Sequence, residues 1–172
     1  GIDYKGQLAN RDFSASVTLF KRKITDLITQ DNVQWVNSQG QIQMRGFEAD
    51  AKLALNDRWS LQADMTRNLT ESRTGVTLND IPSFFARSRV GFESENHLWG
   101  AGTAIRYIRD VTSSKNVEYG HYSVVDADAY RYLDAAHQHR LSLLVENLFD
   151  RDYVTSRASN VDNLGRRHGR VV

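Results

Sequence analysis

Apolar and polar residues alternate at a spacing of two along most of this chain, and this period constrains the fold more than any other feature. Successive side chains of a β-strand point to opposite faces, so the period predicts strands with one apolar and one polar face. A helix with these sequences would mix both kinds of residue on every side. The alternating stretches are Phe13–Leu19, Phe47–Leu55, Trp59–Thr66, Phe84–Glu93, Trp99–Tyr107 and Leu141–Glu146.

The segments between the strands alternate between short and long. The short ones are Leu8–Asp12, Asn56–Arg58, Ser94–His97 and His137–Arg140. The long ones are Gln30–Met44, Thr70–Ser83, Val111–His121 and Thr155–Gly169, and they hold the single proline, Pro82. Up-and-down barrels of bacterial outer membranes have this asymmetry, with tight periplasmic turns and long extracellular loops. We therefore predict an all-β, antiparallel up-and-down transmembrane β-barrel.

Four aromatic residues are expected to lie at strand ends beside the short turns, where an aromatic girdle would meet the periplasmic membrane interface. They are Phe13, Trp59, Phe84 and Trp99. The alternative is that these rings form the core of a soluble barrel. The alternation of short and long connections favours the membrane barrel.

Composition excludes several other classes. The 172 residues contain no apolar run of the roughly 20 residues that a membrane-spanning helix needs. The net charge of +1 provides no field that would attract nucleic acid. The absence of cysteine removes disulfides, thiolate nucleophiles and sulfur metal sites. A barrel remains compatible, because its lumen-facing residues are polar and lower the mean hydropathy.

The pattern predicts about eight complete strands and a stub at each end, over residues 1–7 and 169–172. Eight strands can close into a small barrel, so an autonomous outer-membrane barrel with a structural or adhesive role is one alternative. An open sheet edge in lipid would leave backbone groups unpaired. We therefore favour a partial barrel, with about eight to nine strands of a larger one.

The segment Glu146-Asn147-Leu148-Phe149-Asp150-x-x-Tyr153 follows an apolar strand and resembles the penultimate strand of TonB-dependent outer-membrane receptors. Other segments resemble further strands of that family, in the same order. They are Gly1-Ile2-Asp3-Tyr4-Lys5, Ser16–Phe20 with Ile24–Ile28, Asn37-Ser38 with Arg45-Gly46-Phe47-Glu48, Asp80-Ile81-Pro82, and Tyr122–Asp126. The resemblance implies a structural role for Arg45, Gly46, Glu48, Asn147, Leu148, Phe149, Asp150 and Tyr153.

The resemblance also implies a function. Such a receptor is a barrel of about 22 strands in the outer membrane of a Gram-negative bacterium, and an N-terminal plug domain fills it. It imports a small metal chelate, most often a ferric siderophore, with cobalamin and haem as alternatives. The TonB–ExbB–ExbD complex supplies the energy. Residues 1–172 would be the C-terminal part of the barrel, without the plug domain and the TonB box, and in contact with outer-membrane lipid.

Candidates for catalysis or metal binding are weak. His137 and His139 share one side of a short turn, but no carboxylate completes a metal site at a fixed spacing. The pairs Asp126 with Asp128 and Asp150 with Asp152 are explained by lumen-facing charge. The segment 160–163 has oxygen ligands without a known calcium-loop spacing. An outer-membrane enzyme, the third alternative, would need a converging set of such groups. We therefore expect no enzyme, metal site or cofactor.

Ligand binding is the remaining function, and extracellular loops and upper lumen residues would provide it. Arginines and tyrosines suit an anionic, planar, metal-chelating ligand through charge-assisted hydrogen bonds and stacking. The candidates are Trp35, Arg73, Arg106, Arg109, Tyr119, His121 and Tyr122. For any one of them alone, we favour the alternative that it is an ordinary loop or interface residue. The facing pattern itself predicts that charge is tolerated poorly at Ala51 and Val90, and better at Asp50.

Overall fold

The structure is a computed structural model that describes residues 1–26, 28–31, 34–37, 41–72, 81–112, 118–119, 121–158 and 161–164. The regular elements in these ranges are all β-strands. The described part of the chain contains no helix that could cross a membrane.

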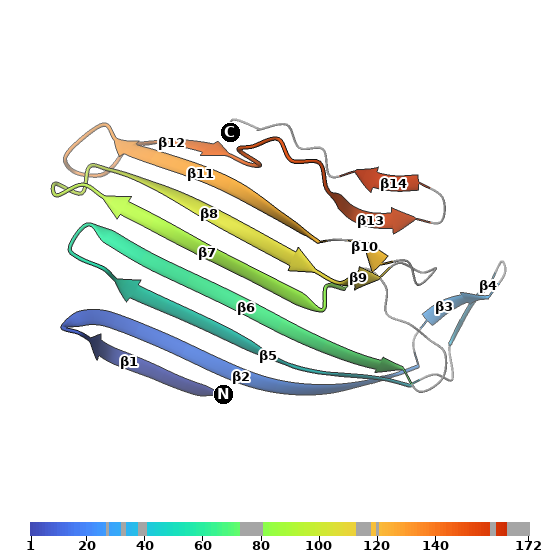
Figure 1. The fold of residues 1–172 in the computed structure, drawn as a ribbon. Helices are drawn as coiled ribbons and strands as arrows, with labels where there is room; N and C mark the ends of the chain where they lie inside the picture. The colour runs from blue at the N-terminus through green and yellow to red at the C-terminus, as the bar shows by residue number, and fades with distance from the viewer. Residues whose placement is uncertain are drawn as a thin grey trace.

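Eight strands form one antiparallel sheet in which each strand pairs with the sheet strands before and after it in the chain. They are β1 (Ile2–Leu8), β2 (Arg11–Thr25), β5 (Gln41–Ala54), β6 (Trp59–Ser72), β7 (Phe84–Glu93), β8 (Trp99–Arg109), β11 (Tyr122–Tyr132) and β12 (Arg140–Val145). This up-and-down order (Figure 1) confirms the predicted fold class. Within the described residues no pairing joins β1 to β12. The described sheet is therefore open. This differs from the alternative of an autonomous eight-stranded barrel, in which the first and last strands would pair.

Three small hairpins lie at the end of the sheet that carries the long connections (Figure 1). They pair β3 (Ile28–Asp31) with β4 (Gln34–Asn37), β9 (Val111–Thr112) with β10 (Glu118–Tyr119), and β13 (Val154–Ala158) with β14 (Val161–Leu164). The sequence predicted irregular loops here, and β5 already begins at Gln41, inside the first of them. These segments contain too few residues for a period of two to be visible, although they are rich in β-branched residues.

Residues that pair across strands share one face of the sheet, and the register gives each face a clear character. One row joins Ala15, Ala51, Ala63, Ser88, Ile105 and Val125. The adjacent row joins Ser16, Asp50, Asp64, Arg87, Arg106 and Val124. We call these the apolar face and the polar face. The alternation of apolar and polar residues is confirmed in each stretch for which the sequence predicted it.

The apolar face is not covered by other parts of the described chain. Ile2 is 79% exposed and Leu19 is 77% exposed, and Ile105 and Leu143 are also exposed. Contiguous apolar surface of this extent marks contact with a partner or a membrane. The apolar face therefore requires an apolar environment outside this chain.

Aromatic rings gather at both ends of the apolar face. At the short-turn end, Phe92 lies between Trp59 and Trp99, with ring centroids 5.0 Å apart in each pair. The prediction for Phe84 was wrong, because β7 runs from the long-connection end and Phe84 is its first residue. There its ring packs edge-on against Tyr107, 6.1 Å away.

The turn between β11 and β12 is longer than the predicted His137–Arg140, because β11 already ends at Tyr132 and the turn occupies residues 133–139. The Asp134 carboxylate orders it by accepting hydrogen bonds from the backbone N–H groups of Gln138 (3.0 Å) and His139 (2.8 Å). These two bonds stabilise the charged carboxylate, and they lower the pKa of Asp134 below its ordinary value. The ring of His137 stacks on Tyr132, with centroids 4.3 Å apart.

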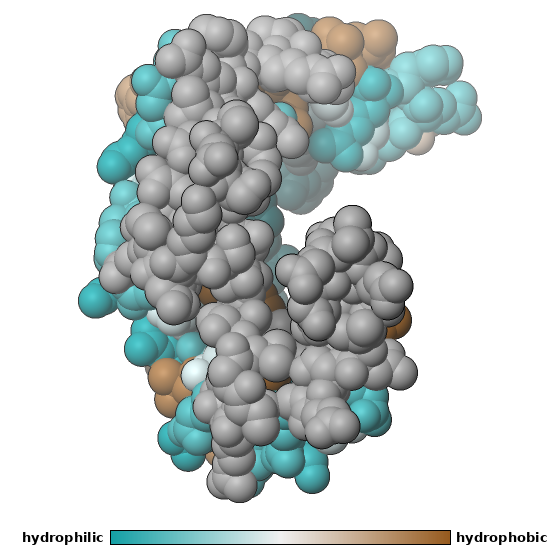
Figure 2. Space-filling model, turned by 90° about the vertical axis from the view of Figure 1, so that its right-hand side faces the viewer, coloured by the Kyte–Doolittle hydropathy of each residue, from teal (hydrophilic) through white to brown (hydrophobic). Residues whose placement is uncertain are grey.

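The sheet curves. Seen from the end of the long connections, the molecule bends around a hollow (Figure 2). On the polar face, the ion pair Arg89–Asp128 joins β7 to β11 across the intervening strand β8. Side chains converge in this way on the concave side of a curved sheet, so the polar face lines the hollow.

Candidate functional site

The candidate site lies on the polar face of β7, β8 and β11, toward the long connections. Its centre is an ion pair in which Arg106 donates to Asp126 from both Nε (2.8 Å) and Nη2 (3.1 Å). The Asp126 side chain is only 16% exposed. Bidentate pairs of this kind fix both side chains in one orientation. Arg106 is therefore held against the sheet rather than extended into the hollow.

The backbone of Asn147 completes the environment of Asp126. Its N–H donates to Asp126 Oδ1 at 2.9 Å, so the carboxylate accepts hydrogen bonds from a second segment of chain. The N–H of Leu148 donates to the carbonyl of Val125 at 2.7 Å. These two bonds pin the segment after β12 to the neighbouring strand β11.

Asn147 also organises its own turn, and its side chain is almost fully buried. Its Oδ1 accepts from the N–H of Arg151 (2.9 Å), and its Nδ2 donates to the carbonyl of the same residue (3.0 Å). Asn147 and Asp150 have positive φ angles of 51° and 47°, which asparagine and aspartate tolerate better than most residues. The segment from Glu146 to Tyr153, which resembles the family motif, thus contains a turn that is held by hydrogen bonds between the Asn147 side chain and the Arg151 backbone.

Two tyrosines stack beside this centre. Tyr122, the first residue of β11, lies against Tyr153, with ring centroids 4.6 Å apart and planes inclined by 29°. Tyr153 follows the Asn147 turn, which brings it back to the sheet. The stack offers a partly exposed aromatic surface near the Arg106–Asp126 pair.

A second ion pair lies on the same face, closer to the short turns. Arg89 Nη2 is 2.7 Å from both carboxylate oxygens of Asp128. Arg89 on β7 reaches β11 by crossing β8 over Gly102, where a Cβ atom would collide with its guanidinium group. Glycine at position 102 therefore makes the pair possible.

Asp110 forms a further cluster at the end of the long connections. It accepts from Ser83 Oγ (2.9 Å) and Arg109 Nε (3.1 Å), and His121 Nε2 lies 3.5 Å away. Arg67 is at the limit of an ion pair, 4.0 Å away. The cluster joins the connection before β7 to the one after β8, at the rim of the hollow.

Arg87 and Lys52 are among the cations of the polar face that form no ion pair with the part of the chain that the structure describes. Arg87 on β7 is exposed and lies opposite Asp64 and Arg106 in the register. Lys52 on β5 is exposed and lines two hollows of about 650 Å³ and about 360 Å³. These side chains are available to an anionic ligand.

The candidates named from sequence fall into three groups. Arg106 and Tyr122 lie together on the polar face, and His121 lies at the rim with Asp110. Arg109 pairs with Phe84 in the register, which places it on the apolar face. Arg109 lies three positions after Arg106, and an odd offset along a strand reverses the face. The remaining three candidates have no described side chain. Trp35 and Tyr119 are in β4 and β10 with side chains outside the described set, and Arg73 lies outside the described residues.

Sequence reasoning did not name Arg87, Arg89 or Asp110 as site residues. The parity of β7 could have identified the first two, since both alternate with the apolar residues of that strand. No pattern singled out Asp110, because its role depends on two connections that are distant in sequence.

The residues for which the family resemblance implied a structural role differ in their contacts. Arg45 pairs with Glu71 at 2.5 Å, and Glu48 is exposed on the polar face. Gly46 lies against the backbone of Arg67, where a Cβ atom would collide with the carbonyl, and its Cβ position is 2.8 Å from the Phe20 ring. Leu148 and Phe149 are exposed in the Asn147 turn.

Metal ligands do not gather in the described residues, where no three His, Asp or Glu side chains lie close enough to hold an ion. His139 Nδ1 contacts Asp134 at 3.1 Å, and His137 stacks on Tyr132 as described above. Asp126 and Asp128 each pair with a different arginine. The two aspartates are therefore parts of separate ion pairs.

Residues 1–148 match the family model described as TonB dependent receptor-like, beta-barrel. The chain belongs to the TonB-dependent receptor β-barrel family. No functionally curated protein matches it. The family is one of transport receptors and not of enzymes, in agreement with the expectation from sequence.

Solved structures of such receptors share the fold. The ferric-catecholate import receptor Fiu of E. coli K12 is 19% identical, with a TM-score of 0.67 over 94% of this chain and 25% of its own. The ferric yersiniabactin uptake receptor FyuA of Yersinia pestis is 20% identical, with a TM-score of 0.69 over 93% and 26%. The copper transporter OprC is 20% identical, with a TM-score of 0.68 over 89% and 25%. The receptor chain thus spans about a quarter of the length of these structures.

Proposed function

We propose that the receptor chain forms part of the wall of an outer-membrane transporter that takes up a small anionic metal chelate. The ligand class is a ferric siderophore, and the TonB–ExbB–ExbD complex provides the energy. Family membership supports the transport role. The descriptions of Fiu and FyuA as ferric-siderophore receptors support the ligand class.

The observation that carries the proposal is the chemistry of the polar face. Arg106 and Arg89 are neutralised by aspartates, whereas Arg87 and Lys52 remain exposed without an ion pair in the described chain. Arg87 lies two strands from Tyr122 in the sheet, and Lys52 lies four strands from it. Such cations, on the same face as the stacked pair Tyr122–Tyr153, suit a ligand that is both anionic and planar. The apolar face supports placement in a Gram-negative outer membrane, because it is uncovered over the whole sheet.

The test is uptake of radiolabelled iron by iron-starved cells that carry a deletion of the gene, complemented with the wild type or with variants. Each of several ferric siderophores is supplied alone, and cobalamin and haem serve as further arms. We expect uptake of one ferric chelate to depend on the gene and on TonB. Uptake of cobalamin or haem alone would replace the ligand class, and the absence of any TonB-dependent uptake would overturn the transport role.

Arg87→Ala tests the polar face. We expect it to weaken binding of the chelate by about tenfold, the loss of one charge-assisted hydrogen bond. The matched control is Arg11→Ala. Arg11 lies beside the β1–β2 turn and pairs with Asp57, which lies in the turn between β5 and β6. Equal binding by both variants would show that Arg87 does not contact the ligand.

A further inference from the structure

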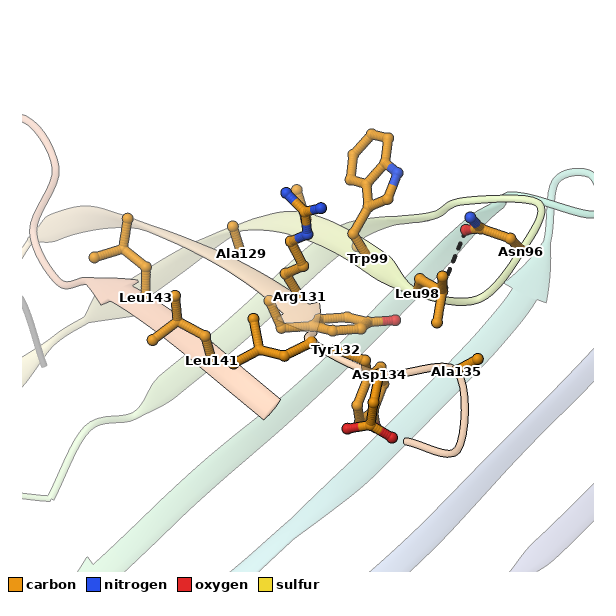
Figure 3. A pocket seen from close by; sticks show the side chains of 14 residues that line it. Asn96, Leu98, Trp99, Ala129, Arg131, Tyr132, Asp134, Ala135, Leu141 and Leu143 are labelled. Atoms are coloured by element: carbon orange, nitrogen blue, oxygen red, sulfur yellow. Dashed lines mark hydrogen bonds between the residues drawn. The ribbon is translucent and has the colours of Figure 1, made fainter. Parts of the chain in front are cut away.

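A hollow on the apolar face lies where β8, β11 and β12 approach the short turns (Figure 3). Its volume of about 710 Å³ is within the range of pockets that hold small organic ligands, about 300–1,000 Å³. Most of its lining is apolar and comes from Leu98, Trp99, Ala101, Ala129, Leu141 and Leu143. Gly100, Tyr130 and Tyr132, which belong to rows of the polar face, also line it near the short turns. The residues Arg106 and Asp126 of the candidate site are not part of its lining.

The floor of the hollow consists of small residues between large ones. In one cross-strand row, Ala101 and Ala129 lie between Phe92 on β7 and Leu143 on β12. In the next row toward the turn, Trp99, Arg131 and Leu141 are partners. Trp99, Ala129 and Arg131 project to the same side of the sheet (Figure 3). The alanines therefore form the bottom of a trough, and the row of Arg131 closes its end.

Arg131 is the single cation of this lining, and it is exposed. It forms no ion pair with any residue in the described ranges. The other charged residue of the lining, Asp134, already accepts hydrogen bonds from two backbone N–H groups and contacts His139. The hollow thus combines an apolar trough with the guanidinium group of Arg131 at its end, and the Asp134 carboxylate also lines it.

The position of the charge agrees with a membrane interface. Trp99 and Arg131 share a row, and the neighbouring rings of Phe92 and Trp59 continue the aromatic band at this end of the sheet. Aromatic bands of this kind lie at the level of the lipid headgroups. A guanidinium at that level meets phosphates, which it binds through two parallel N–H groups.

We propose that this hollow is a binding site for one anionic diacyl phospholipid of the periplasmic leaflet. The headgroup phosphate binds Arg131, and an acyl chain lies over Ala129 and Ala101 between Leu143 and Phe92. The site would hold one lipid in a fixed place over β8, β11 and β12. This inference rests on the proposed placement in the outer membrane.

The experiment is native mass spectrometry of the full-length protein in detergent, with phosphatidylglycerol added in steps. Phosphatidylcholine with the same acyl chains is the comparison lipid. The variants are Arg131→Gln, which removes the charge, and Ala129→Leu, which fills the trough. The controls are Arg11→Gln at another short turn and Ala63→Leu, which enlarges an alanine elsewhere on the apolar face.

We expect the wild type to retain one phosphatidylglycerol in preference to phosphatidylcholine. Arg131→Gln should weaken retention by about tenfold, and Ala129→Leu should weaken it for both lipids. The two controls should retain the lipid as the wild type does. Equal retention by wild type and Arg131→Gln, or no preference between the two lipids, would overturn the site.

Two further measurements separate the causes of a negative result. Heat-modified migration on gels tests whether each variant is folded; Arg131 is exposed and Ala129 is half-buried beside the open trough. Chelate binding by the same variants tests the transport proposal independently. Loss of lipid retention with normal chelate binding concerns this site alone, whereas absence of chelate binding in the wild type concerns the proposed function.

Discussion

Arg89 and Asp128 form an ion pair across an intervening strand, with Arg89 Nη2 placed 2.7 Å from both carboxylate oxygens of Asp128. The pair bridges β7 and β11 and passes over Gly102 of β8. A contact across three strands resists flattening of the sheet. The curvature that forms the hollow is therefore stabilised by a specific polar contact as well as by the twist of the strands.

A double-mutant cycle measures this contribution. The side chains of Arg89 and Asp128 are 26% and 33% exposed, so their coupling should lie between that of surface pairs and that of buried pairs, at about 1–2 kcal/mol. We expect Arg89→Ala and Asp128→Ala to destabilise the protein in urea, and the double variant to cost less than their sum. Strict additivity would show that the pair contributes nothing.

The faces of the sheet could be predicted from sequence because a strand has a period of two that needs no tertiary information. Every alternating stretch, such as Phe47–Leu55, became a strand with the predicted sides. The ends of strands were assigned less well. Phe84 was placed beside a short turn, although it directly follows the long connection Thr70–Ser83 and is the first residue of β7.

The candidate site was only partly predictable. Arg106 was identified by residue type, but its partner Asp126 lies on another strand, and the register between them is set by pairing along the whole strand. The bonds of Asn147 to Arg151 and to Asp126 depend on a turn that leaves the sheet. Ion pairs between strands distant in sequence cannot be derived from the spacing within any one strand.

The two faces predict opposite responses to an added charge. We expect Ala51→Lys, on the apolar face, to impair membrane assembly by about 2–4 kcal/mol if it lies near the bilayer midplane. Thr66→Lys is the matched variant on the polar face, where it lies opposite Glu48. We expect it to change stability by less than about 1 kcal/mol. Folding yield into lipid vesicles with increasing urea measures both.

Equal costs at positions 51 and 66 would contradict the assignment of the faces. Val90→Lys gives an independent check on another strand, since Val90 lies on the apolar face opposite Leu61 and Thr103. Asp50→Asn should be mild by comparison, because Asp50 is exposed on the polar face and only its hydrogen bond from Ser16 Oγ would change.

Asn147→Ala should weaken the turn that links β12 to β11. The substitution removes both side-chain bonds to the backbone of Arg151, which lie in a partly buried place, and this costs about 1–3 kcal/mol. Ser142→Ala is the control, since Ser142 is exposed on β12. Urea unfolding followed by tyrosine and tryptophan fluorescence measures both variants. A cost for Asn147→Ala no greater than that of the control would show that the turn adds no stability.

The turn of residues 133–139 should lose order in acid. Backbone hydrogen bonds from Gln138 and His139 lower the pKa of Asp134, so its carboxylate is more acidic in the folded turn than in an unfolded chain. A group with a lowered pKa stabilises the fold above its unfolded pKa, which is about 4 for aspartate. That stabilisation is lost as the pH falls below this value and through the folded pKa. Hydrogen exchange at the Gln138 and His139 amides should therefore be slow at neutral pH and lose its protection in acid. In Asp134→Ala the same amides should show no protection at any pH, when their exchange rates are compared with those of an unfolded chain at that pH. Protection that does not change with pH in the wild type would show that the carboxylate does not hold the turn.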